Sequence, residues 1–414
     1  MRIRNEATDS RPLRIAVLKD RYQSAFMSPR ESRHTLVRRR FAPLNLLKSS
    51  LDGLTVMAPG PKTDLLHAHN RIPLGARRFI MSFESSLPRR YAWTADNFLV
   101  RTMTQAICSH KCRRIVAMSH FARRSFAAQH AGASYFEDLM AKTLVRHPNL
   151  SIGDRPDTLD LQAEGPLQLA FVGGHFGRKG GCVAVRIAEL AQARGLPVHV
   201  TIISGLEVGG AIWTDPTQDG FFDPYFALLN LPNVSFLGSQ PNAVVRATLA
   251  ASHFSLLPTL ADTFGYSAVE SMAEHTPVIG AAICALPEFI QDGVNGMLLP
   301  LETTTIGAWA GLDYDGRGST AYARRFSETV DHLAEAALAR LAPYFEDRAA
   351  LSDMRQSARA TAERMFDAEK AGPLWDALYE EAATEPLSQP PYADTPASIS
   401  SPNFPDTTLH QSET

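Results

Sequence analysis

The stretch Ala261–Pro300, ADTFGYSAVESMAEHTPVIGAAICALPEFIQDGVNGMLLP, carries two carboxylic acids in the spacing D-x7-E, Asp262 and Glu270. The order of its residues predicts a strand end, a Gly-containing turn, a helix, the short strand PVIG and a loop. In an open α/β sheet such a turn lies at the carboxyl end of a parallel strand, where ligands bind. The first N–H groups of the helix favour an anion, and they belong to Gly265, Tyr266 and Ser267. Because Glu270 falls on the next helical turn, the stretch predicts a site for a diphosphate that is followed by a ribose.

A second Gly-rich turn follows the apolar strand LQLAFVG, which begins at Leu167, and reads GHFGRKGG. Gly173 and Gly174 allow the backbone to approach a ligand closely, and Arg178 and Lys179 bring two adjacent cations to the start of the next helix. Phosphate is the expected ligand. The spacing fits neither the dinucleotide fingerprint G-x-G-x-x-G nor the Walker loop. A Gly-rich turn with solvated charges is the alternative for this segment alone.

Strand and helix patterns alternate along the chain, which predicts parallel sheets in an α/β fold. With 414 residues the chain is long enough for two domains of ordinary size. The polar segment Asn149–Gly165 contains Gly and Pro and is interpreted as a linker. We expect an N-terminal domain over residues 1–155, a C-terminal domain over 166–365, a helix over 366–383 that packs on either domain, and a disordered tail over 384–414. Strands of the first domain are expected at Arg14–Leu18, Leu54–Met57, Leu65–Ala68, Arg78–Phe83, Ile115–Met118 and Thr143–Arg146.

Charge is divided unevenly along the chain, although the formal net charge is only −2. Residues 1–150 contain 26 Lys and Arg against 10 Asp and Glu, and the remaining residues contain 15 against 33. A basic half can face an acidic substrate, an anionic membrane surface or nucleic acid. A cluster that could dock reversibly on an anionic leaflet contains Arg33, Arg38, Arg39 and Arg40. A basic face turned toward the acidic half is the alternative, and nucleic acid is not expected because no aromatic-rich RNA-binding motif occurs.

Composition indicates a soluble globular protein, with 45% apolar and 20% charged residues. No apolar stretch approaches the roughly 20 residues that cross a bilayer, and the start MRIRNEATDS lacks the apolar core of a signal peptide. A cytoplasmic location is therefore expected, with peripheral contact at the inner face of the membrane as a further option. The cysteines, Cys108, Cys112, Cys182 and Cys284, show neither disulfide nor zinc spacing and are expected as thiols.

Together the two turns resemble those of the retaining glycosyltransferases of family 4. The D-x7-E block is similar to the family's E-x7-E, and its P-V-I and P-E…D-G-x-N-G stretches match Pro277–Ile279 and Pro287–Gly296. Phe171–Gly181 is similar to the family's phosphate loop. The resemblance implies the GT-B fold of two facing Rossmann-like domains, with a final helix that returns to the first domain. Weaker matches in the first half are DLLHAHN (Asp64–Asn70), IVAMSHFARRSF (Ile115–Phe126) and TLVRHPNL (Thr143–Leu150).

The resemblance implies a role for each matched residue. Arg178 and Lys179 would hold the donor diphosphate, Glu270 would bind the ribose, and Asp262 would contact the transferred sugar. Further donor contacts are implied at Gly173, Gly174, Gly238, Phe264, Gly265, Tyr266 and Ser267, with Gly238–Asn242 beside the base. The implied reaction is retaining transfer from a UDP- or GDP-linked sugar to a saccharide or lipid-linked acceptor, in envelope or exopolysaccharide assembly. Such chemistry mainly needs stabilised leaving-group charge, which cations and helix N-termini supply, so neither a metal nor another cofactor is expected.

Three positions depart from the family pattern. The first acid is Asp262 where the family usually has Glu, and a displacement of about 1 Å at a reacting centre can cost about a hundredfold in rate. The segment Lys19–Ser24 replaces a Gly-rich acceptor loop. A common His at the end of a later strand is replaced within SFES, where Glu84 is the expected cleft or acceptor residue. Glu84 could instead pair on the surface with Arg89 or Arg90.

Two other functions remain open from the sequence. A nucleotide-sugar-binding protein with little or no transferase activity would fit Asp262 and the missing acceptor loop. A metal-dependent hydrolase would use His67 and His69, which lie on one face of a strand, although no further ligand cluster follows. Otherwise both are ordinary histidines, with His69 as a cleft or acceptor residue. The pair Asp313-x-Asp315 lies in a Gly-rich stretch and is expected to be a solvated loop.

Overall fold

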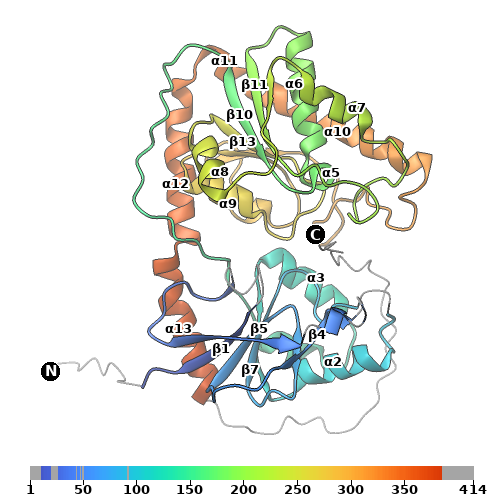
Figure 1. Cartoon of the computed structure of the whole chain (residues 1–414), viewed down its shortest axis with the longest axis vertical. Coiled ribbons are helices and arrows are strands. Elements are labelled where there is room, and N and C mark those ends of the chain that lie inside the picture. Colours follow the sequence, from blue (N-terminus) through green and yellow to red (C-terminus); the bar gives the residue numbers. More distant parts are fainter. Residues whose placement is uncertain are drawn as a thin grey trace, which may run out of the picture.

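The computed structural model describes residues 11–19, 27–42, 44–46, 48, 51–90 and 93–384. Most of the segment Lys19–Ser24 and the tail expected to be disordered after Thr384 lie outside these residues. Two α/β domains are stacked along the long axis of the molecule (Figure 1).

The first domain is built on a six-stranded sheet in which every pairing is parallel. The central strands β5 and β7 are buried at every residue, as expected for a parallel sheet covered on both faces. In spatial order the strands are β2 (Thr35–Arg39), β1 (Arg14–Leu18), β5 (Leu65–His69), β7 (Phe79–Phe83), β8 (Cys112–Ala117) and β9 (Thr143–Val145). A small separate sheet contains β3 (Phe41–Ala42), β4 (Leu54–Met57) and β6 (Ile72–Leu74). The helices are α2 (Phe98–Cys108), α3 (His120–His130) and α4 (Phe136–Ala141).

The second domain also contains a six-stranded parallel sheet. In spatial order its strands are β12 (Val234–Phe236), β11 (Val198–Ile203), β10 (Leu167–Val172), β13 (Phe254–Leu257), β14 (Val278–Ala281) and β15 (Gly296–Leu299). Numbered along the chain, this is the doubly wound order 3-2-1-4-5-6. The direction of winding reverses between β10 and β13, and such a reversal opens the crevice in which α/β sheets bind ligands.

Helices cover the second sheet and continue past it to the first domain. They are α5 (Phe176–Lys179), α6 (Gly181–Ala193), α7 (Asp223–Ala227), α8 (Asn242–Ala250), α9 (Tyr266–Ala273), α10 (Thr320–Leu341), α11 (Pro343–Glu346), α12 (Ser352–Met365) and α13 (Ala368–Thr384). In Figure 1, α12 runs along the second domain and α13 continues beside β1 of the first. Trp375 of α13 stacks on His67 of β5, with ring centroids 4.9 Å apart. The chain therefore crosses between the domains twice, once in the linker and once between α12 and α13.

The acidic residues of α13 neutralise part of the basic first domain. Asp376 accepts a hydrogen bond from the backbone N–H of Arg33 at 3.0 Å. Arg33 and Arg114 form ion pairs with Glu380 and Glu381 of α13. Within the arginine cluster that could have docked on a membrane, Arg39 also bonds to the backbone carbonyl of Pro61 at 2.9 Å. At least part of the cluster is therefore engaged inside the protein.

The predicted fold class is confirmed, because the strand and helix order gives two parallel-sheet domains. All six strands expected in the first half are present within a few residues, but Leu54–Met57 (β4) belongs to the small separate sheet. The sequence analysis missed β2, β3 and β6. β2 escaped detection because its sequence, TLVRR, ends in two arginines and none of its residues is buried. Its backbone pairing with β1 makes it an edge strand of the sheet.

Among the described residues, no helix is both long enough and apolar enough to span a bilayer. All four cysteines are free thiols, and Cys112, Cys182 and Cys284 are buried, as expected.

Candidate functional site

Two turns meet at the reversal point of the second sheet. The phosphate-type turn leaves β10 at Gly173, whose N–H bonds to the carbonyl of Ile203 at 3.1 Å. A Cβ at Gly173 would lie 2.9 Å from the Cβ of Lys179, so glycine is needed where the turn folds back on itself. At Gly174 a Cβ would lie 3.3 Å from the carboxylate of Glu207. The turn is therefore compact, and it places Arg178 and Lys179 next to the loop that follows β13.

Arg178 ties the two turns together. Its Nη1 donates to the carbonyl of Ala261 at 2.8 Å, and its Nε donates to Nδ1 of His175 at 3.0 Å. Burial, together with the charges of Arg178 and Lys179, lowers the pKa of His175 to about 4. His175 is therefore neutral near pH 7 and can accept this bond. Since part of the guanidinium is used within the protein, Arg178 orders the turn as well as adding positive charge.

Lys179 and Asp262 form an ion pair across the two turns. Burial lowers the pKa of Lys179, and the charges of Asp262 and Glu84 oppose that effect. For Asp262 burial would raise the pKa, but the charges of Lys179 and Arg178 outweigh it and hold the pKa below its ordinary value. The lowered pKa of Asp262 favours its ionised form, and the two groups lie together where the sequence analysis expected the diphosphate and the transferred sugar.

The start of α9 presents backbone and hydroxyl donors beside this pair. Gly265 caps the helix at φ 92°, and a Cβ there would lie 2.7 Å from Leu286, so the turn requires glycine. The hydroxyl of Ser267 is buried and has no hydrogen-bond partner among the described residues. An orphaned donor at a helix start fits an oxygen-rich anion.

Phe264 differs from its neighbours because its ring is fully buried and stacks on Phe289 at 5.4 Å. Its backbone N–H donates to Asp262 Oδ1 at 3.4 Å. The side chain of Phe264, one of the expected donor-binding residues, is therefore part of the core. Only the backbone of Phe264 is left to order the site.

Glu270 lies half-buried on α9 and accepts a hydrogen bond from Asn242 Nδ2 at 3.3 Å. Burial raises its pKa despite this bond and the charges of Arg246 and Arg30. Gly238, at the end of β12, takes φ 66° and accepts a hydrogen bond from the N–H of Ser204 at 3.1 Å. The expected ribose acid and the expected base-binding segment therefore lie on the same side of the sheet, since Asn242 begins α8 directly after Gly238.

Glu84 and His69 lie together in the first domain. His69 Nε2 is 3.4 Å from Glu84 Oε1, and Arg89 Nη2 donates to Glu84 Oε2 at 3.2 Å. Burial would raise the pKa of Glu84, but the hydrogen bond from His69 and the charge of Arg89 lower it overall. The charge of Glu84 is among those that act on Lys179 of the other domain. The alternative for Glu84 was an ion pair with Arg89 or Arg90 on the surface. Glu84 does pair with Arg89, but the prediction of a surface position is wrong because Glu84 is buried.

A chain of hydrogen bonds leads from Glu84 to α13. His69 Nδ1 lies 2.8 Å from Ser82 Oγ, which lies 3.0 Å from His67 Nε2, and His67 Nδ1 lies 2.9 Å from the hydroxyl of Tyr379. With Glu84 ionised and both histidines neutral, one direction satisfies every link: Tyr379 donates to His67, His67 to Ser82, Ser82 to His69 and His69 to Glu84. The chain therefore links the buried carboxylate of Glu84 to the C-terminal helix.

Because of these hydrogen bonds, the ring nitrogens of His67 and His69 are not free to bind a metal ion. Both ring nitrogens of His67 are hydrogen-bonded within the protein, and burial next to His69 lowers its pKa to about 3. Over the part of the chain that the structure describes, no group of three or more His, Cys, Asp or Glu side chains could hold a metal ion. Asp313 and Asp315 lie in an exposed loop, where Asp313 accepts a hydrogen bond from the N–H of Gly316 at 2.9 Å.

Sequence reasoning missed two acidic residues that shape the site. Asp215 is fully buried beneath the phosphate turn, where a Cβ on Gly177 would lie 2.8 Å from its carboxylate. Burial raises the pKa of Asp215 to about 7, against hydrogen bonds from Gly209 and Thr214. Glu288 binds the N–H groups of His120 and Phe121 in the first domain, at 2.8 and 2.6 Å. Of these two residues only Glu288 belongs to a motif seen in the sequence, the P-E stretch, and that motif does not predict an interdomain contact.

Solved structures share this architecture. A glycosyltransferase from Rickettsia africae superposes with a TM-score of 0.58 at 12% identity, covering 91% of this chain and 100% of that one. HepE from Anabaena, in complex with UDP and glucose, superposes with a TM-score of 0.53 at 16% identity, covering 89% and 98%. At such identities the likeness shows the fold alone. The protein has the GT-B fold of glycosyltransferases, as the sequence analysis predicted.

Sequence comparison places the second domain in a family. Residues 166–310 match the profile of the glycosyl transferases group 1 family, so the chain contains a domain of that family and the resemblance is confirmed. The D-inositol 3-phosphate glycosyltransferase of Mycolicibacterium vanbaalenii is 31% identical over 219 residues, 47% of this chain and 47% of that protein. Its counterpart in Mycolicibacterium gilvum is 29% identical over 246 residues, 55% and 52%. The matches span about half the length of these curated relatives.

Proposed function

We propose that this protein is a retaining glycosyltransferase that moves a sugar from a nucleotide-sugar donor to a saccharide or lipid-linked acceptor without a metal ion. One observation carries the proposal: Lys179, Asp262 and the start of α9 converge at the reversal point of the second sheet. This is the place where open α/β sheets bind nucleotides.

Donor binding would rearrange the ion pair at the centre of the site. The diphosphate competes with Asp262 for the ammonium of Lys179 and accepts bonds from the start of α9, including the unpaired hydroxyl of Ser267. Asp262, released from Lys179, then turns to a hydroxyl of the transferred sugar. Glu270 accepts hydrogen bonds from the ribose diol, one helical turn beyond the phosphate.

The chemical step follows from this placement. The bond between the anomeric carbon and the β-phosphate oxygen breaks as the acceptor oxygen forms a bond on the same face of the sugar. The leaving phosphate takes the proton of the acceptor hydroxyl. Lys179, Arg178 and the dipole of α9 stabilise the charge that develops on the leaving diphosphate, which is the largest demand of such a reaction. Glu84 of the first domain, whose charge acts on Lys179, is suited to orienting the acceptor.

The relatives support a UDP-linked hexose as donor, since HepE binds UDP and glucose and the curated relatives are named as glycosyltransferases. Envelope or exopolysaccharide assembly in the cytoplasm, at the inner face of the membrane, is the setting that we propose. The exposed arginines Arg38 and Arg40 are suited to reversible contact with an anionic surface.

The first test is the shift of melting temperature with UDP, GDP and ADP. A ligand at 100 times its dissociation constant stabilises the folded state by about 2.7 kcal/mol. We expect one nucleotide family to stabilise the native protein and Glu302→Ala, an exposed control, but not Glu270→Ala. Transfer from the matching nucleotide sugar should persist in EDTA. If no nucleotide changes the melting temperature, the donor site is wrongly assigned.

A nucleotide-sugar-binding protein without transferase activity is the second candidate. The observation in its favour is that the shorter acid, Asp262, is bound to Lys179 instead of extending freely toward a sugar. Asp262→Glu distinguishes the two functions. A large increase in the rate of sugar transfer would indicate that the native site has lost catalytic activity. A decrease in that rate would show that Asp262 is matched to its own substrate.

A further inference from the structure

The two domains enclose a pocket of about 250 Å³ that adjoins Asp262. One wall comes from α3 of the first domain, and the others come from the loop at Trp213 and from a hairpin that follows β15. Asp262 and Thr263 form the wall nearest the proposed donor site. A group in this pocket would therefore lie beside the sugar to be transferred, where an acceptor has to approach.

The hairpin, residues 303–309, holds the pocket against the first domain. Thr303 and Trp309 form an antiparallel bridge, and the N–H of Thr304 donates to the carbonyl of Ala308 at 2.8 Å. Ile306 lies near the tip of the hairpin, where its carbonyl accepts a hydrogen bond from Arg124 Nε of α3 at 3.2 Å. Both domains thus fix the position of this wall.

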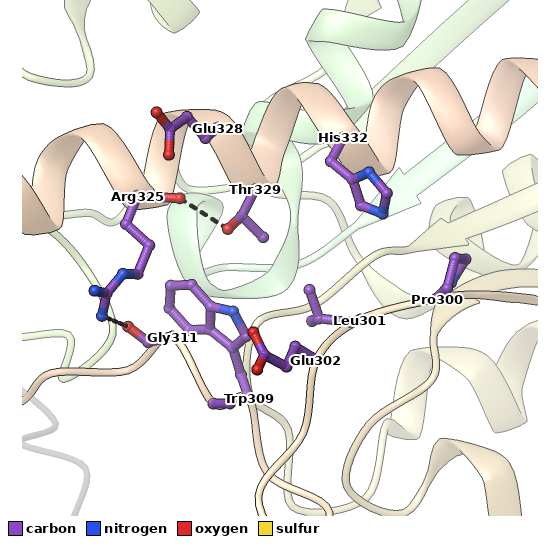
Figure 2. Close-up of a pocket in the computed structure, with 10 residues that line it drawn as sticks. Pro300, Leu301, Glu302, Trp309, Gly311, Arg325, Glu328, Thr329 and His332 are labelled. Carbon is purple, nitrogen blue, oxygen red and sulfur yellow. Dashed lines mark hydrogen bonds between the residues drawn. The ribbon is translucent and has the colours of Figure 1, made fainter.

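Trp309 lines both this pocket and a wider groove of about 620 Å³, which Figure 2 shows. In Figure 2 the indole lies among polar and charged side chains that α10 and the adjoining loop provide, namely Glu302, Arg325, Glu328, Thr329 and His332. The interdomain pocket has a different lining. Apart from Arg90 and Gln129, its large side chains are apolar or aromatic: Phe121, Trp213, Leu260, Ile306, Trp309 and Leu312.

The two longest polar side chains on the pocket wall, Gln129 and Arg90, are engaged within the protein. Gln129 Nε2 donates to the carbonyl of Pro88, and Gln129 Oε1 accepts from the N–H of Leu87, both at 3.0 Å. Arg90 Nη2 donates to the carbonyl of Gln129 at 3.3 Å. Hydroxyls of a sugar ring that lie against these apolar side chains would lack partners, which disfavours a sugar there, whereas an apolar group gains by leaving water.

We propose that this pocket, the aglycone pocket, binds an apolar group of the acceptor, so that the acceptor is an amphiphilic glycoside or alcohol and not a free sugar. The inference rests on the proposed function, because it assumes that Asp262 marks the reacting end. A water molecule takes up ~30 Å³ of liquid volume, and a carbon atom of a ring or chain is of similar size. The pocket therefore has room for about one aromatic ring or for the first carbons of an alkyl chain. A longer chain would extend out of the pocket.

Intrinsic fluorescence provides a direct test, since two of the chain's four tryptophans, Trp213 and Trp309, line the pocket. The full chain, saturated with UDP, is titrated with methyl, octyl and phenyl β-D-glucopyranoside below micelle-forming concentrations. We expect the octyl or the phenyl glucoside to bind at least tenfold more tightly than the methyl glucoside. The comparison of octyl with phenyl distinguishes a chain from a ring as the natural apolar group.

Two variants show where the apolar group binds. Ile306→Asn places an amide in the aglycone pocket and should remove most of the tenfold advantage. Leu301→Asn is the matched control, because Leu301 lines the groove of Figure 2 and not the pocket, and it should keep the advantage. The shift of melting temperature with UDP, measured on both variants, reports that each is folded with an intact donor site.

Failure of this inference can be told from failure of the proposed function. If neither UDP nor GDP nor ADP gives a thermal shift in the native protein, the proposed function fails. If UDP binds but the three glucosides bind equally, or if Ile306→Asn retains the advantage, the aglycone pocket is refuted. If Ile306→Asn changes only the rate at which the donor is hydrolysed, the pocket binds the transferred sugar. That result also overturns the proposal.

Discussion

Glu288→Ala should weaken the contact that holds the two domains together at the cleft. Its carboxylate accepts hydrogen bonds from the N–H groups of His120 and Phe121, at 2.8 and 2.6 Å, at the N-terminus of α3. The third N–H, of Ala122, is already capped by Ser119 at 2.9 Å. Glu288 of the second domain therefore completes the cap of a helix in the first.

The magnitude follows from these two bonds. A hydrogen bond to a charged group contributes about 1.5–3 kcal/mol, and a carboxylate at a helix N-terminus adds about 0.3–1 kcal/mol. Because the contact is partly exposed, we discount the total to about 2–3 kcal/mol. If the bonds exist only in the closed arrangement, Glu288→Ala shifts the balance toward an open one by roughly 30- to 150-fold. Glu288→Gln keeps one accepting oxygen and should give a smaller shift.

Small-angle scattering and kinetics measure the two consequences. We expect Glu288→Ala to show a larger radius of gyration and a transfer rate that is tenfold lower or more, with unchanged affinity for UDP, because the donor residues lie within the second domain. Glu302→Ala, an exposed acid in the same region, should behave like the native protein. If the radius of gyration and the transfer rate of Glu288→Ala both match the native values, the contact does not control closure.

Lys179→Ala should reduce the affinity for UDP by roughly 10- to 100-fold in calorimetry, since a charged hydrogen bond of about 1.5–3 kcal/mol is lost; unchanged affinity would remove Lys179 from the donor site. Asp215 has a pKa of about 7 in the folded protein against an ordinary 3.8, so the folded state retains a proton and native stability falls as pH rises from about 4 to about 7. Urea unfolding at several pH values should show a flatter slope for Asp215→Asn, and an unchanged slope would contradict the assignment. Tyr379→Phe removes the donor to the buried His67 and should destabilise the fold by about 1–3 kcal/mol in urea, whereas the exposed Tyr314→Phe should have little effect; equal stability of the two variants would argue against the hydrogen-bond chain.

The donor half of the site could be predicted because its information is local. Each turn lies within one strand–turn–helix segment, and the parallel order of the strands brings the segment ends to the same edge of the sheet. Lys179 and Asp262 are therefore in contact although 83 positions separate them. Phe264 shows the limit of such reasoning, because the backbone path was predictable but the rotation of its ring into a cluster with Phe289 was not. Side-chain direction at that position depends on packing between remote segments.

The acceptor half could not be predicted because its contacts join remote segments through single residues. Neither His67 nor Ser82 belongs to a motif that announces a partner 312 or 15 positions away, yet together they connect Tyr379 to the cleft. The charge division gave a partial signal, since a strongly basic first half requires counter-charges. The structure supplies some of them on α13, at Glu380 and Glu381. The helix that neutralises the basic domain is thus also the one that these hydrogen bonds link to Glu84, so a change in its docking would alter stability and the geometry of the cleft together.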